Sequence, residues 1–233
     1  MILDFFILLL FVIFFIFIIF IFIFSIEKSF KLPKYCFFFG IYSIIINVLG
    51  SIFIFLNCLN IINIPIFRGF VSIIHYEDFL SAILSFSSAL VFSILLLYKG
   101  IQKVTDMEAR FALDLMNPKL LFIDNQLERK EISEEEASVQ KNEIMLNVDF
   151  YSNINETSWF FLKILLTNTA LFLINLIISI ILRSSNILSF EDFNYYISDL
   201  SNLIFYVIVA QVIVFVIMCI NVSSRPKTVF QFP

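Results

Sequence analysis

The chain has 233 residues, of which 61% are hydrophobic, and its mean hydropathy is +0.99. A water-soluble globular domain of this size carries far fewer apolar residues, so composition excludes that class. The net charge of −4 is small and gives no indication of nucleic-acid binding.

Five apolar segments are long enough to cross a bilayer as helices that rise about 1.5 Å per residue. In hydrocarbon every backbone N–H and C=O must be paired within the protein, which favours helices over isolated strands. The first apolar run is too long for a signal peptide and no basic segment precedes it, so we expect it to be retained. The expected spans are Ile2–Ser25, Tyr35–Cys58, Phe79–Tyr98, Ser158–Leu182 and Leu200–Val222.

These spans divide the chain into three parts. Residues 1–98 hold the first three spans, 99–157 form a charged loop, and 158–233 hold the last two spans and a short tail. The apolar stretch 61–74 is interrupted by Pro65 and Gly69, and we expect it to be re-entrant or interfacial. The predicted fold class is therefore all-α: a polytopic transmembrane protein with about five spans and one helical loop outside the membrane.

Basic residues predict the orientation. Twelve of the fifteen Lys and Arg residues follow the first, third or fifth span, whereas Arg68 and Arg183 follow the second and fourth. Because basic loops stay on the cytoplasmic side, we expect the N-terminus outside and both the 99–157 loop and the C-terminus in the cytoplasm.

Small and polar residues recur on one face of three spans, at steps of three, four or seven residues. Such residues let helix backbones approach and hydrogen-bond across the gap, each bond contributing about 0.6–2 kcal/mol. Close helix packing is one interpretation of this pattern, and a water-lined conduit is the other. The candidate packing residues are Gly40, Ser43, Asn47 and Gly50 in the second span and Asn168 and Asn175 in the fourth.

Charged residues, which would mark an ion or proton path, are almost absent from the spans, so we do not expect a self-contained pump. The three cysteines are interpreted as small buried side chains, and the single histidine does not combine with them at a metal-site spacing. No phosphate-binding glycine loop or nucleophile–base pair occurs. We therefore predict no metal, no cofactor and no enzymatic activity.

The 99–157 loop holds twelve acidic and seven basic residues. Asn117-Pro118 predicts a break in the chain, because the residue before proline avoids the α region. Ser133 followed by Glu136 is a capping box, and we expect the helix that it opens to run to about Asn147.

The start of this loop resembles the signature of the FHIPEP family, the export-gate membrane proteins of flagellar and virulence type III secretion systems. That signature reads Lys-Gly, then Ala-Arg-Phe-x-Leu-Asp-x-Met, then Lys-x-x-x-Ile-Asp, and the chain follows it without a gap. Asp149-Phe150-Tyr151 also resembles a flagellar form, although the choice between flagellar and virulence systems stays open. The matching residues are Lys99, Gly100, Ala109, Arg110, Phe111, Leu113, Asp114, Met116, Lys119, Ile123 and Asp124.

The chain also departs from the family. A Pro-Gly-Lys-Gln turn becomes Asn117-Pro118-Lys119-Leu120, the arginines of the second span become Ser43 and Ile52, and Lys163-Ile164 stands where the family has Gly-Asp. The family's later helices and its soluble domain, which docks chaperones and export substrates, are not expected within these 233 residues.

The resemblance implies a membrane component of a protein export apparatus in the bacterial inner membrane. Its expected partners are further copies of itself in a homo-oligomeric ring, other export-apparatus membrane subunits and membrane lipid. No nucleic acid is expected as a partner. Arg110, Asp114, Lys119 and Asp124 are its candidate gating residues, although the same charges would also serve as structural salt bridges. Two alternatives stay open: a decayed or split gate fragment without the soluble domain, and an unrelated helical membrane scaffold.

Overall fold

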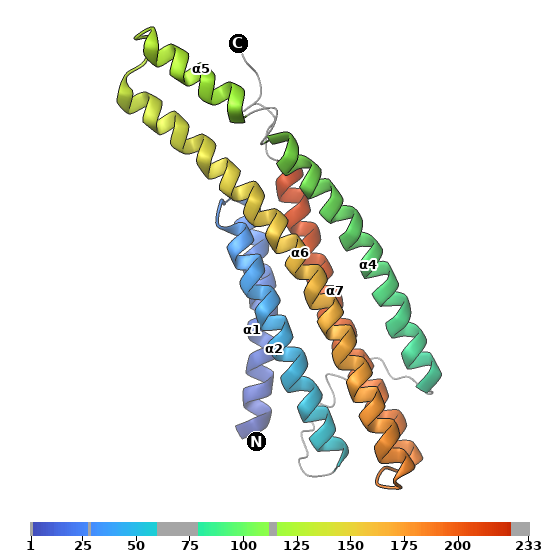
Figure 1. Ribbon diagram of the computed structural model, residues 1–233. Coiled ribbons are helices and arrows are strands. Elements are labelled where there is room, and N and C mark those ends of the chain that lie inside the picture. Colours follow the sequence, from blue (N-terminus) through green and yellow to red (C-terminus); the bar gives the residue numbers. More distant parts are fainter. Residues whose placement is uncertain (1, 28, 60–78, 112–115, 225–233) are drawn as a thin grey trace.

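The computed structural model describes residues 2–27, 29–59, 79–111 and 116–224, and the regular elements in these ranges are all helices (Figure 1). The predicted re-entrant stretch 61–74 lies outside the described residues. The helices are α1 (Ile2–Ile26), α2 (Leu32–Cys58), α4 (Phe79–Arg110), α5 (Asn117–Glu128), α6 (Glu134–Ser184) and α7 (Phe190–Ser224).

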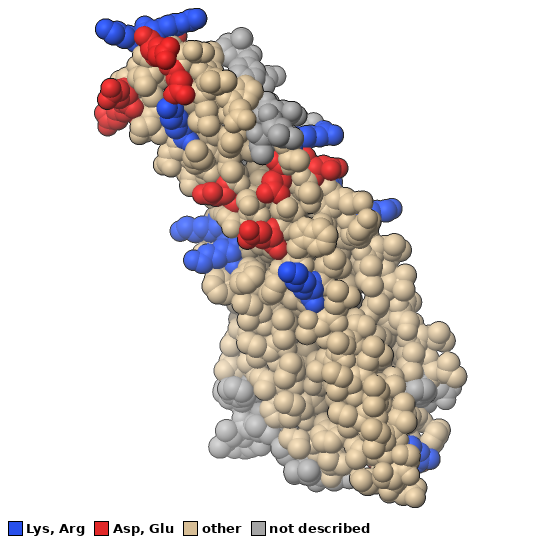
Figure 2. Space-filling view, viewed as in Figure 1, with Lys and Arg blue, Asp and Glu red and all other residues tan. Residues whose placement is uncertain are grey.

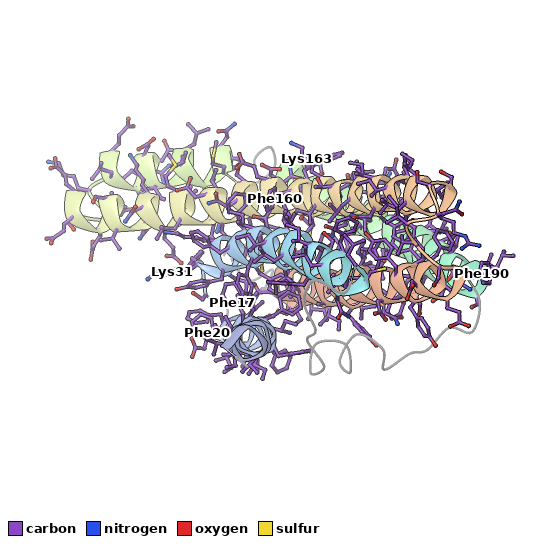
Figure 3. The ribbon with its side chains drawn as sticks, turned by 90° about the horizontal axis from the view of Figure 1, so that it is seen from below. Phe17, Phe20, Lys31, Phe160, Lys163 and Phe190 are labelled. Carbon is purple, nitrogen blue, oxygen red and sulfur yellow. The ribbon has the colours of Figure 1, made fainter. Side chains whose placement is uncertain are left out.

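Helix α7 lies at the centre of a bundle and packs against α1, α2, α4 and α6. Residues from Tyr196 to Val222 supply many of the most buried apolar side chains of the core, among them Leu203, Ile208 and Phe215, each 0% exposed. Helix α1 packs at the edge against α2 and α7, with Phe14 stacked on Phe39 at 5.0 Å between ring centroids. Figure 3 shows α1 end-on beside α2, with Phe17 and Phe20 on it.

The expected all-α polytopic class is confirmed. Within the described part of the chain, α2, α4, α6 and α7 are each long and apolar enough to cross a membrane, and Val12–Ile26 of α1 is a shorter apolar helix. Large apolar side chains such as Phe92, Leu166 and Ile177 are more than half exposed on the outer face of the bundle. These side chains contact lipid when the bundle is in a membrane, since lipid tails accept apolar surface that water would not.

Two helices extend beyond their predicted membrane segments. Helix α4 continues past Tyr98 to Arg110, and α6 runs unbroken from Glu134 to Ser184. The prediction that the helix opened by Ser133 ends near Asn147 is therefore wrong. No Pro or Gly occurs between Lys119 and Ser184, so nothing in the sequence breaks this helix where its composition changes from charged to apolar.

Charge gathers at one end of the molecule. Figure 2 shows Lys, Arg, Asp and Glu over the upper end, where α5 and the first half of α6 project, whereas the lower half of this face is almost entirely uncharged. At 51 residues, α6 is about 75 Å long, roughly twice what a bilayer core requires. Its first half therefore stands outside the apolar belt and carries α5 with it.

Candidate functional site

A buried polar seam joins three helices inside the apolar belt. Gln211 of α7 donates from Nε2 to Ser43 Oγ of α2 at 2.7 Å, and Asn168 Nδ2 of α6 lies 3.4 Å from Gln211 Oε1. These three side chains are 0–2% exposed. Ser43 in turn donates to the Gly40 carbonyl at 2.7 Å, so its hydroxyl both donates and accepts. One glutamine amide thus connects α2, α6 and α7.

Asn47 lies one turn further along α2 and is 0% exposed. Neither its Nδ2 nor its Oδ1 has a hydrogen-bond partner among the residues that the structure describes. A buried amide left in this way costs about 1–3 kcal/mol. The seam therefore ends in an unsatisfied group that packing alone does not explain.

Further polar bonds attach α7 to its neighbours. Tyr196 donates its hydroxyl to Asn175 Oδ1 of α6 at 2.9 Å, and Ser201 donates to the Ala82 carbonyl of α4 at 2.9 Å. Near the charged end, Asn221 donates to the Ser25 carbonyl of α1 at 2.7 Å. The central helix is thus hydrogen-bonded to four others.

Three glycines mark the closest helix approaches. A Cβ on Gly40 would lie 2.6 Å from Ile164 of α6, and one on Gly50 would lie 2.5 Å from Leu203 of α7. A Cβ on Gly100 of α4 would overlap the ring of Phe215, which is 0% exposed. Real Cβ atoms do not approach so closely, so the absence of a side chain is what permits these contacts.

Outside the belt, α5 folds back on the first half of α6 as a helical hairpin. Ile123 of α5 packs with Ala137 and Ile144 of α6 in a small cluster separate from the main core. Ser133 caps α6: its hydroxyl accepts from the Glu136 amide at 3.2 Å, and its own amide donates to the Glu136 carboxylate at 3.0 Å. That hydrogen bond lowers the pKa of Glu136 below its ordinary value.

Three of the four predicted gating residues, Arg110, Lys119 and Asp124, lie in the described part of the chain. Asp124 accepts an ion pair from Lys141 of α6 at 2.6 Å, whereas Arg110 is exposed in the last turn of α4 and Asp114 lies outside the described residues. Lys119 is half-buried on α5; burial lowers its pKa, and the carboxylate of Glu143 opposes that shift.

A junction between the signature helix and α6 was not foreseen from the sequence. Asn155 of α6 donates to the Glu108 carboxylate at 2.5 Å and accepts from the Thr105 hydroxyl at 2.9 Å. Thr105 and Glu108 lie within the stretch that carries the family signature. The partner on α6 is about fifty residues away in the chain, and only the fold brings it there. No metal-ligating cluster occurs among the described residues.

Comparison with known proteins shows where this arrangement belongs. A model of the FHIPEP family matches residues 1–185, which cover most of the bundle, the whole signature and the hairpin. The chain belongs to the FHIPEP family.

Curated relatives match shorter stretches. The flagellar biosynthesis protein FlhA of Borreliella burgdorferi is 39% identical over 62 residues, which are 27% of this chain and 9% of that protein. FlhA of Proteus mirabilis is 32% identical over 83 residues, 36% of this chain and 12% of that protein. The chain thus matches only about a tenth of the length of these relatives. No solved structure is significantly similar to it.

The FHIPEP signature, from Lys99 to Asp124, extends over the last part of α4 and the first part of α5. Gly100, its second residue, is the point where α4 touches Phe215 of α7. The signature therefore continues the membrane bundle into the hairpin. Lys163 and Ile164, which stand where the family has Gly-Asp, lie on α6; Lys163 is exposed and Ile164 is buried (Figure 3).

Proposed function

We propose that this chain is a membrane component of a type III protein export apparatus in the bacterial inner membrane. The observation that carries the proposal is the family match over residues 1–185, which includes the signature on the α4–α5 junction. The names of the two relatives, both flagellar biosynthesis proteins, favour a flagellar system over a virulence system.

The test is secretion in the native host. Replacing the gene by a deletion should abolish export of a reporter fused to a secreted substrate, and the wild-type chain should restore it. Normal export in the deletion strain would overturn the proposal. Crosslinking in the native membrane, followed by identification of the partners, then tests whether other export-apparatus membrane subunits and further copies of this chain surround it.

The hairpin is the part of the chain that we assign to gating. Lys119 and Asp124 lie on α5, and Asp124 holds α6 through Lys141. We infer that Arg110, Asp114, Lys119 and Asp124 together govern how the hairpin sits on the bundle or on a neighbouring copy. Lys119→Ala and Asp124→Ala should each reduce reporter export while leaving the amount of chain in the membrane unchanged. Glu131→Ala, at the exposed hairpin tip, is the matched control, and unchanged export in both test variants would remove the hairpin from the mechanism.

We infer further that the charged end faces the cytoplasm, because basic loops are retained there. Replacing Cys36, Cys58 and Cys219 by Ala gives a background for single cysteines. Ser185→Cys, in the α6–α7 turn, should react with an impermeant maleimide on intact spheroplasts, whereas Ser138→Cys, on the hairpin, should react only after lysis. The reverse pattern would invert the topology.

A further inference from the structure

A groove between α2 and α6 lies at the boundary between the charged end and the apolar belt. Its volume is about 420 Å³, and it is formed by the start of α2 and the residues just before Ser158 on α6. The two helices run side by side here, since the Thr157 hydroxyl of α6 lies 3.5 Å from the Pro33 carbonyl of α2. No contact of the seam or of the hairpin described above involves this groove.

The lining of the groove changes character along its length. Lys31, Lys34 and Asn153 line it together with Glu156, and the aromatic rings of Phe30 and Phe37 complete the walls. Phe37 packs against Phe160 of α6 in a tilted arrangement, at 4.4 Å between ring centroids, and this pair continues the apolar surface toward the belt. Phe30 flanks the two lysines on the side toward the charged end, and Phe37 flanks them on the side toward the belt, so the polar side chains lie between two aromatic rings.

The charge of the groove is positive. Lys31 and Lys34 are exposed, and neither forms an ion pair with a described residue. Glu156 contributes one opposing charge. Figure 3 shows Lys31 projecting outward from the start of α2, beside α6.

We propose that this groove binds an anionic phospholipid, with the phosphate held by Lys31 and Lys34 and an acyl chain lying on Phe37 and Phe160. Basic pockets between transmembrane helices at the cytoplasmic surface suit anionic headgroups, and each lysine there contributes a measurable electrostatic term. Long lysine side chains also reach the headgroup level from an apolar surface. Asn153 supplies a neutral amide to the same headgroup. The leaflet that provides the lipid depends on the proposed orientation, whereas the site itself does not.

The experiment is native mass spectrometry of the purified full chain in mild detergent with equal amounts of phosphatidylglycerol and phosphatidylcholine of the same acyl composition. We expect wild type to retain phosphatidylglycerol with a preference on the order of tenfold, and Lys31→Gln/Lys34→Gln to lose it. Lys99→Gln/Lys103→Gln removes the same charge at the start of the cytoplasmic part of α4, away from the groove, and should keep the preference. An equal loss in both double variants would show general surface attraction and overturn the site.

Two further measurements separate other occupants. Glu156→Gln removes the opposing charge and should raise the preference for phosphatidylglycerol by a few-fold; a fall, with stronger retention of phosphatidylethanolamine by wild type, would indicate an ammonium headgroup and overturn the anionic assignment. Displacement of the lipid by millimolar inorganic phosphate would show an ion site and not a lipid site. Because Glu156→Gln gives a signal of opposite sign, the proposal stays testable if the lysine double variant does not fold. Lipid binding is measured on the purified chain and does not depend on export. The lipid-site proposal and the export proposal can therefore fail independently of each other.

Discussion

The two halves of α6 show how one unbroken helix serves two solvents. From Glu134 to Thr157 it is charged and is held by the small apolar cluster of Ile123, Ala137 and Ile144, by a capping box and by one ion pair. From Ser158 to Ser184 its outer face is apolar. Its inner face packs buried side chains such as Phe161 and Phe172 into the core, and it adds a close approach at Gly40 and hydrogen bonds through Asn168 and Asn175.

The two halves are stabilised differently because water and lipid differ in how they favour the burial of apolar side chains. In water, burying three apolar side chains stabilises the hairpin, whereas lipid tails are as apolar as the side chains and favour no such cluster. Inside the belt, close backbone packing and interhelical hydrogen bonds replace the hydrophobic effect. We therefore expect substitutions in the belt to change stability through steric overlap or lost interhelical hydrogen bonds. Substitutions in the hairpin should have smaller effects on stability, because the hydrogen bonds and the ion pair there are exposed to water.

The largest expected effect comes from closing the α4–α7 approach. Gly100→Leu would push a side chain into the ring of Phe215, which is fully buried and has little room to move. Overpacking of this kind costs about 1–3 kcal/mol, and we expect a value near the top of that range. The measurement is the apparent Tm of the detergent-solubilised chain, followed by size-exclusion chromatography.

Ser87→Leu is the matched control for this substitution, because Ser87 is on the exposed, lipid-facing side of the same helix. It should change the free energy of unfolding by no more than about 0.5 kcal/mol, so the apparent Tm should stay close to that of wild type. Equal behaviour of the two variants would mean that α4 does not contact α7 at Gly100.

Removing the centre of the seam should have the next largest effect. Gln211→Leu deletes the amide that connects Ser43 and Asn168, each of which is almost fully buried. Interhelical hydrogen bonds of this kind contribute about 0.6–1.7 kcal/mol each, and we expect a loss of stability within that range. Ser43 still donates to the Gly40 carbonyl, which limits the loss. An unchanged unfolding midpoint would contradict the role of Gln211.

The same seam predicts an effect of opposite sign at its other end. Asn47→Leu replaces a buried amide, which has no partner in the described part of the chain, by an apolar side chain of similar size. We expect the chain to gain about 1 kcal/mol, since an unsatisfied group is removed and no bond is lost. A fall in export together with a rise in stability would show that the Asn47 amide serves export and not folding. A loss of stability would indicate that a water or another group satisfies this amide in the membrane.

Much of this organisation was predictable from the sequence, for identifiable reasons. The five spans follow from length alone, and Ser133 with Glu136 gave the capping box because both partners lie within one turn. The continuity of α6 was missed because a change from charged to apolar composition resembles a boundary, although no residue there breaks a helix. The role of Gln211 does not follow from the sequence, because its partners, Ser43 and Asn168, are far away in the chain and meet it only in the bundle.

The capping box gives a smaller effect within the hairpin. Ser133→Ala removes the side chain that accepts from the Glu136 amide, and losing such a cap costs about 0.5–1 kcal/mol. We expect earlier opening of the first turn of α6, measured as faster amide hydrogen exchange from Glu134 to Ala137. Ser138→Ala, exposed one turn further along the same helix, is the control and should exchange as wild type does.

The same cap predicts a dependence on pH. The folded-state pKa of Glu136 is depressed, so its contribution is fully present above the ordinary glutamate pKa and is lost as the pH falls through the lowered folded value. The protection of the first turn, taken relative to the intrinsic exchange rate at each pH, should therefore fall on acidification, and Glu136→Gln should remove that fall. A wild-type first turn whose protection is independent of acid pH would contradict the hydrogen bond to the Glu136 carboxylate.

The smallest expected effect is that of the ion pair between Asp124 and Lys141. Their atoms are 2.6 Å apart, but the side chains are 49% and 38% exposed, so water and salt screen the attraction. A double-mutant cycle with Asp124→Asn and Lys141→Gln should give a coupling of about 0.2–0.5 kcal/mol in hairpin stability, decreasing as salt is added. Comparing this coupling energy with the loss of export distinguishes a gating role of Asp124 from a structural one. If Asp124→Asn reduces export far more than so weak a bond can change the fold, the carboxylate acts in gating. A coupling above about 1 kcal/mol with a proportionate loss of export would instead assign Asp124 a structural role, as one side of a bond that keeps α5 on α6.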